Sequence, residues 1–299
     1  MSLIRNPDQD EMRNGTVITV RRKKLWQYQL EMILEFQHFC EKHNLKWFAT
    51  SGTLLAAIKF HGFNPTDFII SLAMLRPDYD RFRKIAREEF HYPILLDAYY
   101  DHEYPEGTIG AGRWPVFPLI KIRDERTTML EHPKWKDLPQ GIWMDVAPLD
   151  SFPPFANPEL DANFEVLRTL YSATFSPAAV TDSLKKEAKF PISKDQFQKF
   201  LELPYKKRAE IFEMHCGKMF KDDSKYLGTF LNMKLRFEHN WFEKIEWIPF
   251  ENSALPIPSG YEQILKTYYS DYPNTKLFRN IDIWSTDISW REYFAQVEI

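Results

Sequence analysis

Residues 51–53 have the types and order that would allow contact with a phosphate group. Ser51-Gly52-Thr53 follows a short alternating segment and precedes a helical pattern. A glycine turn at the start of a helix presents backbone N–H groups to an anion. Serine and threonine also cap helices that bind no ligand. The turn therefore indicates phosphate binding only when other residues support it.

An aspartate inside an apolar strand pattern is the second feature with possible chemistry. Asp145 lies within Gly141–Ala147, a segment of otherwise apolar residues. A buried carboxylate is costly unless it meets a metal, a cation or several hydrogen-bond donors. Two interpretations remain open: a magnesium ligand, or a partner in a buried salt bridge or turn cap. Asp150 precedes Ser151, Phe152 and two prolines, which favours a turn.

Two cations form the third feature. Lys121 and Arg123 alternate along a predicted strand, Phe117–Arg123, so their side chains share one face. A pair of cations on one face can hold phosphate oxygens. A solvated strand face would have the same spacing, and the sequence leaves both interpretations open.

The composition limits the classes of function. The chain has 299 residues and a net charge of −3, which provides no basic field for non-specific nucleic-acid binding. Cys40 and Cys216 form no C-x-x-C pair, so neither a disulfide framework nor a zinc site is predicted. No run of about 18 uncharged apolar residues predicts a membrane span, and the polar N-terminal residues do not resemble a signal peptide. We expect a cytoplasmic protein.

Hydrophobic spacing predicts the elements that position these residues. Residues 21–44 have apolar side chains at helical steps, and Leu54–Phe60 forms a second predicted helix. Lys46–Thr50 and the apolar run Phe68–Leu75 are predicted strands, the latter buried on both faces. Pro77 is typical of a helix start.

The second half of the chain has a mainly helical pattern. Helices are expected over Asn163–Thr174, Lys194–Glu202 and Lys206–Lys221, and Phe250–Tyr272 is expected to be a proline-rich turn followed by a short helix. This order predicts an α+β fold with helices around a small mixed β-sheet. Its expected parts are an N-terminal extension (1–20), a core (21–155) and a mainly helical C-terminal part (156–299).

An ordered set of motifs resembles the LicD-type phosphorylcholine transferases, relatives of the fukutin group within the nucleotidyltransferase fold. The matching segments are SGTLLAAI (51–58), GFNP (62–65), MLRPDYDRF (74–82), KIRDERT (121–127), GIWMDVAPLDSFP (141–153) and PFENSALPIPSGYEQILKTYYSDY (249–272). The resemblance implies a nucleotidyltransferase-like core. It also implies transfer of a phosphoryl alcohol, typically phosphocholine, from a CDP-linked donor to a cell-surface glycan such as lipopolysaccharide or teichoic acid. Mg²⁺ held by aspartates would activate this reaction.

The same resemblance assigns roles to individual residues. Asp145 is the retained catalytic carboxylate and metal ligand, and Asp67 is the one aspartate that survives of the motif after the Gly-Phe-x-Pro turn. Ile69 and Ser71 occupy the positions of the metal-binding aspartate pair. The donor-binding residues implied are Ser51, Gly52, Thr53, Lys59, Lys121 and Arg123.

The loss of two carboxylates has a chemical consequence. Magnesium requires hard oxygen ligands in near-octahedral geometry, but Ile69 offers no oxygen and Ser71 only a neutral hydroxyl. Losing about 4–7 kcal/mol of metal stabilisation would slow transfer by roughly a thousandfold to a hundred-thousandfold. We therefore expect an impaired transferase. A non-catalytic nucleotide- or glycan-binding pseudoenzyme is the alternative, and an active enzyme using Asp67, Asp145 and Asp150 is a third hypothesis.

Overall fold

The computed structural model describes residues 2–102, 118–152, 158–175, 177, 193–218, 225–230, 234–278 and 283–297. The chain divides into two compact units. The first unit contains Met1–Asp97, Leu119–Leu149 and Phe237–Ile299, and the second contains Ala98–Pro118 and Asp150–Arg236.

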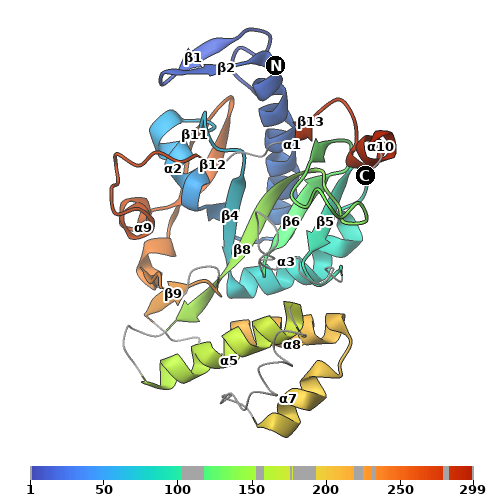
Figure 1. Ribbon diagram of the computed structural model, residues 1–299. Coiled ribbons are helices and arrows are strands. Elements are labelled where there is room, and N and C mark those ends of the chain that lie inside the picture. The colour runs from blue at the N-terminus through green and yellow to red at the C-terminus, as the bar shows by residue number, and fades with distance from the viewer. Residues whose placement is uncertain are drawn as a thin grey trace. The chain divides into compact units, whose positions relative to one another are not determined.

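A mixed β-sheet forms the centre of the first unit. Five strands lie side by side in the order β3 (Phe48–Ala49), β4 (Ile70–Leu75), β8 (Ile142–Phe152), β6 (Ile120–Asp124) and β5 (Ile94–Ala98). Figure 1 shows the last four of them. β4 runs parallel to β8, whereas β3 is antiparallel to β4 and β6 is antiparallel to β8. This arrangement confirms the predicted α+β class and the mixed sheet.

Helices supply the rest of the first unit's core. They are α1 (Val20–Lys42), α2 (Ser51–Phe60), α3 (Arg76–Glu89), α9 (Tyr261–Tyr268) and α10 (Trp290–Gln296). The Thr19 hydroxyl caps α1 by accepting a hydrogen bond from the Arg22 backbone N–H at 3.2 Å. The Phe36 ring on α1 lies 5.4 Å from the Phe82 ring on α3, edge to face. Cys40 on α1 is buried, and its pKa is raised by that burial.

The first unit also contains two β-hairpins. β1 (Glu11–Arg13) and β2 (Thr16–Ile18) are joined by Asn14-Gly15, both at positive φ (50° and 75°). This dipeptide is the preferred two-residue hairpin turn, a signal that the sequence interpretation missed.

The second hairpin pairs β11 (Ile245–Phe250) with β12 (Ser253–Pro258). The prediction that this region is a turn before a helix is wrong for residues 253–258. Its prolines fall in every second residue pair of the hairpin (249 with 254, 247 with 256, 245 with 258). Because hydrogen-bonded and non-hydrogen-bonded pairs alternate in an antiparallel ladder, the prolines occupy the pairs that exchange no hydrogen bonds.

Short elements account for the remaining described part of the first unit. They are β7 (Thr128–Met129), which pairs with β13 (Trp284–Ser285), the strand β10 (Phe237–Glu238) and a 3₁₀ turn at His239–Phe242.

The second unit contains three helices and one strand among its described residues. They are α5 (Pro158–Phe175), α7 (Lys194–Leu201), α8 (Tyr205–Lys218) and β9 (Tyr226–Gly228). β9 pairs with residues 150–152, the end of β8 that belongs to this same unit. Aromatic rings fill its interior, and the Tyr99 hydroxyl donates to Glu213 at 2.6 Å. Asp150 lies inside β8 rather than in a turn, so that prediction is wrong; its backbone pairs with Gly228 instead.

The compact units divide the chain differently from the expected three parts. Residues 237–299 share a unit with residues 1–97, because β11, β12 and α9 contact β3 and α2 of the first unit. Phe117 and residues 219–221, which two predicted elements included, lie outside the described residues. Within the described part, no helix is both long and apolar enough for a membrane span.

Candidate functional site

Three side chains from three neighbouring strands form what we call the central row: Ser71, Asp145 and Lys121. Ser71 on β4 lies opposite Asp145 on β8, and Asp145 lies opposite Lys121 on β6. Residues opposite one another in a sheet project from the same face. The Lys121 Nζ is 3.3 Å from the Asp145 Oδ1. The row therefore joins a hydroxyl, a carboxylate and an ammonium group.

Arg123 lies two residues further along β6 in a buried ion-pair network. Its guanidinium donates to Glu131 Oε2 at 2.7 Å and forms an ion pair with Asp97. Glu131 also accepts from Lys121 Nζ at 2.9 Å. The Trp143 ring faces both cations, at 4.7 Å from Lys121 Nζ and 5.1 Å from Arg123 Cζ. The predicted common face of the two cations is confirmed, and the solvated-face interpretation is wrong, because Arg123 is only 2% exposed.

The charges of this network hold one another in the ionised state. Burial alone would raise the pKa of Glu131, but Lys121 and Arg123 outweigh it and lower that pKa to about 2. Burial would likewise lower the pKa of Lys121, but Asp145 and Glu131 raise it. Lys121 therefore carries its positive charge at neutral pH. Glu131 had no role in the sequence interpretation, because no local pattern separates it from other acidic loop residues.

Asp145 forms an ion pair with Lys121, as the salt-bridge interpretation of this residue predicts. Its side chain is 19% exposed and Lys121 faces it. An ammonium group at this distance offsets the negative charge of the carboxylate. The role of Asp145 as a magnesium ligand remains a prediction.

The other aspartate of the implied site is engaged locally. The Asp67 Oδ1 accepts a hydrogen bond from the Ile69 backbone N–H at 3.1 Å, and the Asp67 main-chain oxygen accepts one from the Arg22 guanidinium. Burial lowers the pKa of Arg22 to about 9, and Asp67 opposes that shift. Because β4 begins at Ile70, Ile69 precedes the strand. The Asp67 carboxylate thus stabilises the turn into β4.

The residues at the implied metal positions do not fit a divalent cation. The Ile69 side chain is hydrocarbon, Ser71 is 9% exposed with a single hydroxyl, and Lys121 places a positive charge beside Asp145. Mg²⁺ takes about six oxygen ligands, and a neighbouring ammonium group repels it. Throughout the described residues, no three His, Cys, Asp or Glu side chains gather in a way that would hold a metal.

The predicted phosphate turn lies next to the central row. The Thr53 hydroxyl accepts a hydrogen bond from the Ser71 backbone N–H at 2.8 Å, which links the first turn of α2 to β4. The Ser51 Oγ lies 3.1 Å from the Tyr269 hydroxyl, and Ser51 has a positive φ of 47°. Gly52, the middle residue of this turn, is buried. Ser51, Gly52 and Thr53 are therefore close to Ser71, whereas Tyr269 joins the site without having been predicted.

Lys59 lies at the opposite end of α2 from that turn. It lies eight positions after Ser51 along the helix, or about 12 Å at 1.5 Å per residue. Its Nζ donates to the main-chain oxygens of Pro273 at 3.0 Å and Thr275 at 2.9 Å. The structure thus groups Ser51, Thr53 and the central row, and it places Lys59 elsewhere.

Comparison with known proteins gives an independent line of evidence. No protein-family model matches the chain. The sequence is 24% identical over 260 residues to the lipopolysaccharide cholinephosphotransferase LicD of Haemophilus influenzae, and the match covers 85% of this chain and 91% of that protein. The chain is therefore a distant relative of a LicD-type transferase over most of its length, as the ordered motifs predicted.

Proposed function

We propose that this chain is a LicD-like protein of phosphocholine metabolism whose transfer step is impaired. Its ligands would be a CDP-choline-like donor and a cell-surface glycan acceptor. The match along most of the chain to a protein named for choline phosphate and lipopolysaccharide supports the lineage. The proposed acceptor is accordingly lipopolysaccharide.

The contact between Lys121 and Asp145 is the observation that carries the proposed impairment. In this row the carboxylate faces an ammonium group at 3.3 Å, and its neighbour on β4 is a serine. A single ammonium group donates hydrogen bonds but does not bridge two phosphate oxygens and a nucleophile as a metal does. Transfer through this row would therefore lack most of the charge stabilisation that metal-dependent phosphoryl transfer uses.

The chain's own groups still support binding of the donor. Lys121 remains charged, but Asp145 and Glu131 balance its charge, so it offers the donor a hydrogen bond rather than a net positive field. The first turn of α2 contacts β4 at Ser71, and a helix N-terminus attracts the diphosphate of a CDP-linked molecule. The Asp145 carboxylate opposes a phosphate, but its pairing with Lys121 reduces that repulsion.

A second candidate function is that of a non-catalytic protein that binds a nucleotide or glycan. The ion pair between Asp145 and Lys121 favours it, because a paired carboxylate is a weak general base. Use of Asp67 as a replacement carboxylate finds no support, since its Oδ1 accepts from the Ile69 backbone N–H.

Calorimetric titration with CDP-choline, with and without Mg²⁺, tests the proposal when combined with an assay of CMP release in the presence of lipopolysaccharide. We expect binding that does not depend on Mg²⁺ and CMP release that is absent or at least about a thousandfold slower than in the double variant Ile69→Asp/Ser71→Asp. Ile69→Asn/Ser71→Asn is the matched control, because it adds polar volume without charge. Fast, Mg²⁺-dependent release by the unaltered chain would overturn the proposed impairment.

A further inference from the structure

We infer that a pocket of the first unit, separate from the central row, binds a phosphorylated sugar. Its volume is about 400 Å³, which falls within the range of small-molecule sites. Three segments far apart in the sequence line it: the β1–β2 turn (14–16), the end of α2 with the loop after it (55–66), and residues 275–278. We call it the hairpin pocket.

The charge of the hairpin pocket favours an anion. Lys59 and Lys276 are its charged lining residues, and no acidic residue lines it. Within the described part of the chain, neither lysine forms an ion pair. Lys59 donates to two main-chain oxygens, which carry no net charge, so its positive charge is not neutralised. Lysine is a frequent phosphate-binding residue because its ammonium group offers three donors.

The uncharged lining is suited to the hydroxyl groups of a sugar. Asn64 is only 7% exposed; its Oδ1 accepts from the Thr66 backbone N–H at 3.1 Å, and its Nδ2 donor has no partner among the described residues. Asn14 and Thr16 add an amide and a hydroxyl from the hairpin. The Phe278 ring, 77% exposed, offers an apolar surface at the same pocket. Amides, hydroxyls and an aromatic face are complementary to a ring that has both hydroxyl groups and apolar C–H faces.

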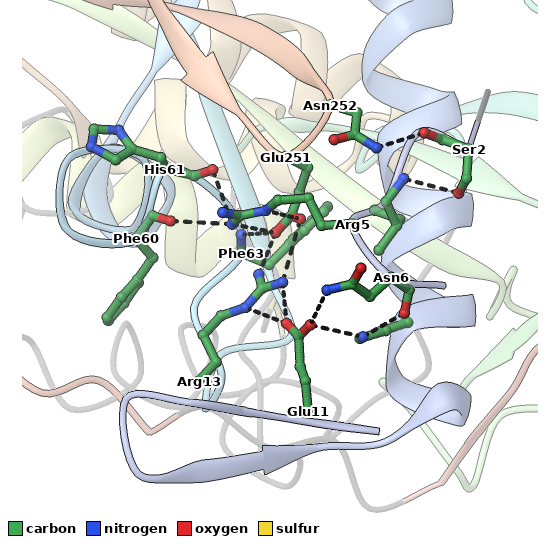
Figure 2. Close-up of polar contacts among 12 residues, drawn as sticks. Ser2, Arg5, Asn6, Glu11, Arg13, Phe60, His61, Phe63, Glu251 and Asn252 are labelled. Atoms are coloured by element: carbon green, nitrogen blue, oxygen red, sulfur yellow. Dashed lines mark hydrogen bonds and ion pairs between the residues drawn. The ribbon is translucent and has the colours of Figure 1, made fainter. Parts of the chain in front are cut away.

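A buried carboxylate fixes two walls of the pocket relative to each other (Figure 2). The Glu251 side chain is fully buried and forms ion pairs with Arg13, which precedes Asn14, and with Arg5 at 3.0 Å. Arg5 also donates to the main-chain oxygens of Phe60 and His61 at 3.3 Å, at the end of α2. The hairpin wall and the α2 wall are thus joined through Glu251, so the pocket is preformed rather than a gap between loose segments.

Titration calorimetry on the full chain tests this inference with glucose 6-phosphate, glucose and inorganic phosphate as probes. We expect glucose 6-phosphate to bind at least about tenfold more tightly than either other probe, because only it satisfies both the lysines and the polar lining. Lys276→Gln should weaken that binding about tenfold, since it removes one charged hydrogen bond. Asn64→Asp, which keeps the acceptor but adds a negative charge, should weaken it by at least as much.

Two control variants distinguish binding in the hairpin pocket from binding elsewhere on the chain. Lys134→Gln removes an exposed lysine that does not line the pocket and should leave the affinity unchanged. Ile69→Asp/Ser71→Asp should also leave it unchanged, because those residues lie outside the pocket lining. The inference is overturned if glucose 6-phosphate does not bind, if Lys276→Gln binds it equally well, or if inorganic phosphate binds as tightly as the sugar phosphate.

Discussion

Two pairs of cations in the first unit have opposite surroundings. Lys121 and Arg123 on β6 are held by the carboxylates of Asp145, Glu131 and Asp97, and Arg123 is nearly inaccessible. Lys59 and Lys276 line a pocket without acidic residues, and among the described residues the Lys59 ammonium group donates hydrogen bonds only to main-chain oxygens. The strand cations therefore stabilise the sheet, whereas the pocket cations keep a net charge for a ligand.

This difference shows that alternation on a strand does not decide what a cation does. The spacing of Lys121 and Arg123 fits phosphate binding and a structural network equally well, and their partners come from other segments of the chain. What decides is whether carboxylates are buried with the cation, because a buried carboxylate is stable only when it is paired. Removing one cation of each pair should therefore affect stability at the sheet far more than at the pocket.

The largest expected effect comes from Arg123→Met. This change leaves Glu131 and Asp97 without their shared partner in a buried site, and we expect it to lower the free energy of unfolding by about 3–5 kcal/mol. Lys276→Met is the matched change at an exposed cation and should cost less than about 0.5 kcal/mol. Urea unfolding followed by circular dichroism measures both. Equal, small losses in the two variants would remove the distinction between the pairs.

A smaller effect is expected at the carboxylate that anchors the hairpin pocket. Glu251→Gln keeps the shape of the side chain but removes the charge that Arg5 and Arg13 share, so it should destabilise the fold by about 2 kcal/mol. It should also weaken glucose 6-phosphate binding, since the hairpin wall loses its attachment. The measurements are urea unfolding and calorimetry. Unchanged affinity in a destabilised variant would show that Glu251 does not hold the pocket in its binding geometry.

The elements that shape both regions differ in how well the sequence predicts them. The apolar run that ends at Leu75 and the helical pattern of residues 21–44 depend on local spacing. The structure contains the corresponding strand β4 and helix α1, with ends that differ from the prediction by one or two residues. The Asn14-Gly15 turn was equally local and was missed. The partners of Arg123 had no comparable signal, because Asp97 and Glu131 reach it only through the pairing of strands and the folding of a loop. The resemblance named residues 71, 121 and 145 separately, and only the pairing of β4, β8 and β6 brings them into one row.

Both regions contain a buried glutamate whose pKa is lowered by neighbouring cations, so acid should destabilise both. Glu131 has a folded-state pKa of about 2, below the ordinary value of 4.5, so its stabilisation is complete above pH 4.5 and is lost as the pH falls toward 2. Burial opposes the shift at Glu251, but hydrogen bonds from Arg5 and Arg13 outweigh it and lower that pKa as well. We expect the free energy of unfolding to decrease between pH 5 and pH 2. Glu131→Gln should flatten this decrease, measured by urea unfolding at each pH, and an unaltered slope would contradict the ionised network.

The smallest expected effect is that of magnesium on the unaltered chain. Because Lys121 faces Asp145 and no second carboxylate occupies position 71, Mg²⁺ should not raise the melting temperature beyond the effect of an equal ionic strength of NaCl. Ile69→Asp/Ser71→Asp should melt at a lower temperature without Mg²⁺, because its added carboxylates repel one another. Mg²⁺ at ten times its dissociation constant should then stabilise this variant by about 1.4 kcal/mol. Thermal unfolding with MgCl₂ and with matched NaCl separates binding from screening. A magnesium-specific rise in the unaltered chain would mean that the central row accepts a divalent cation despite its lysine.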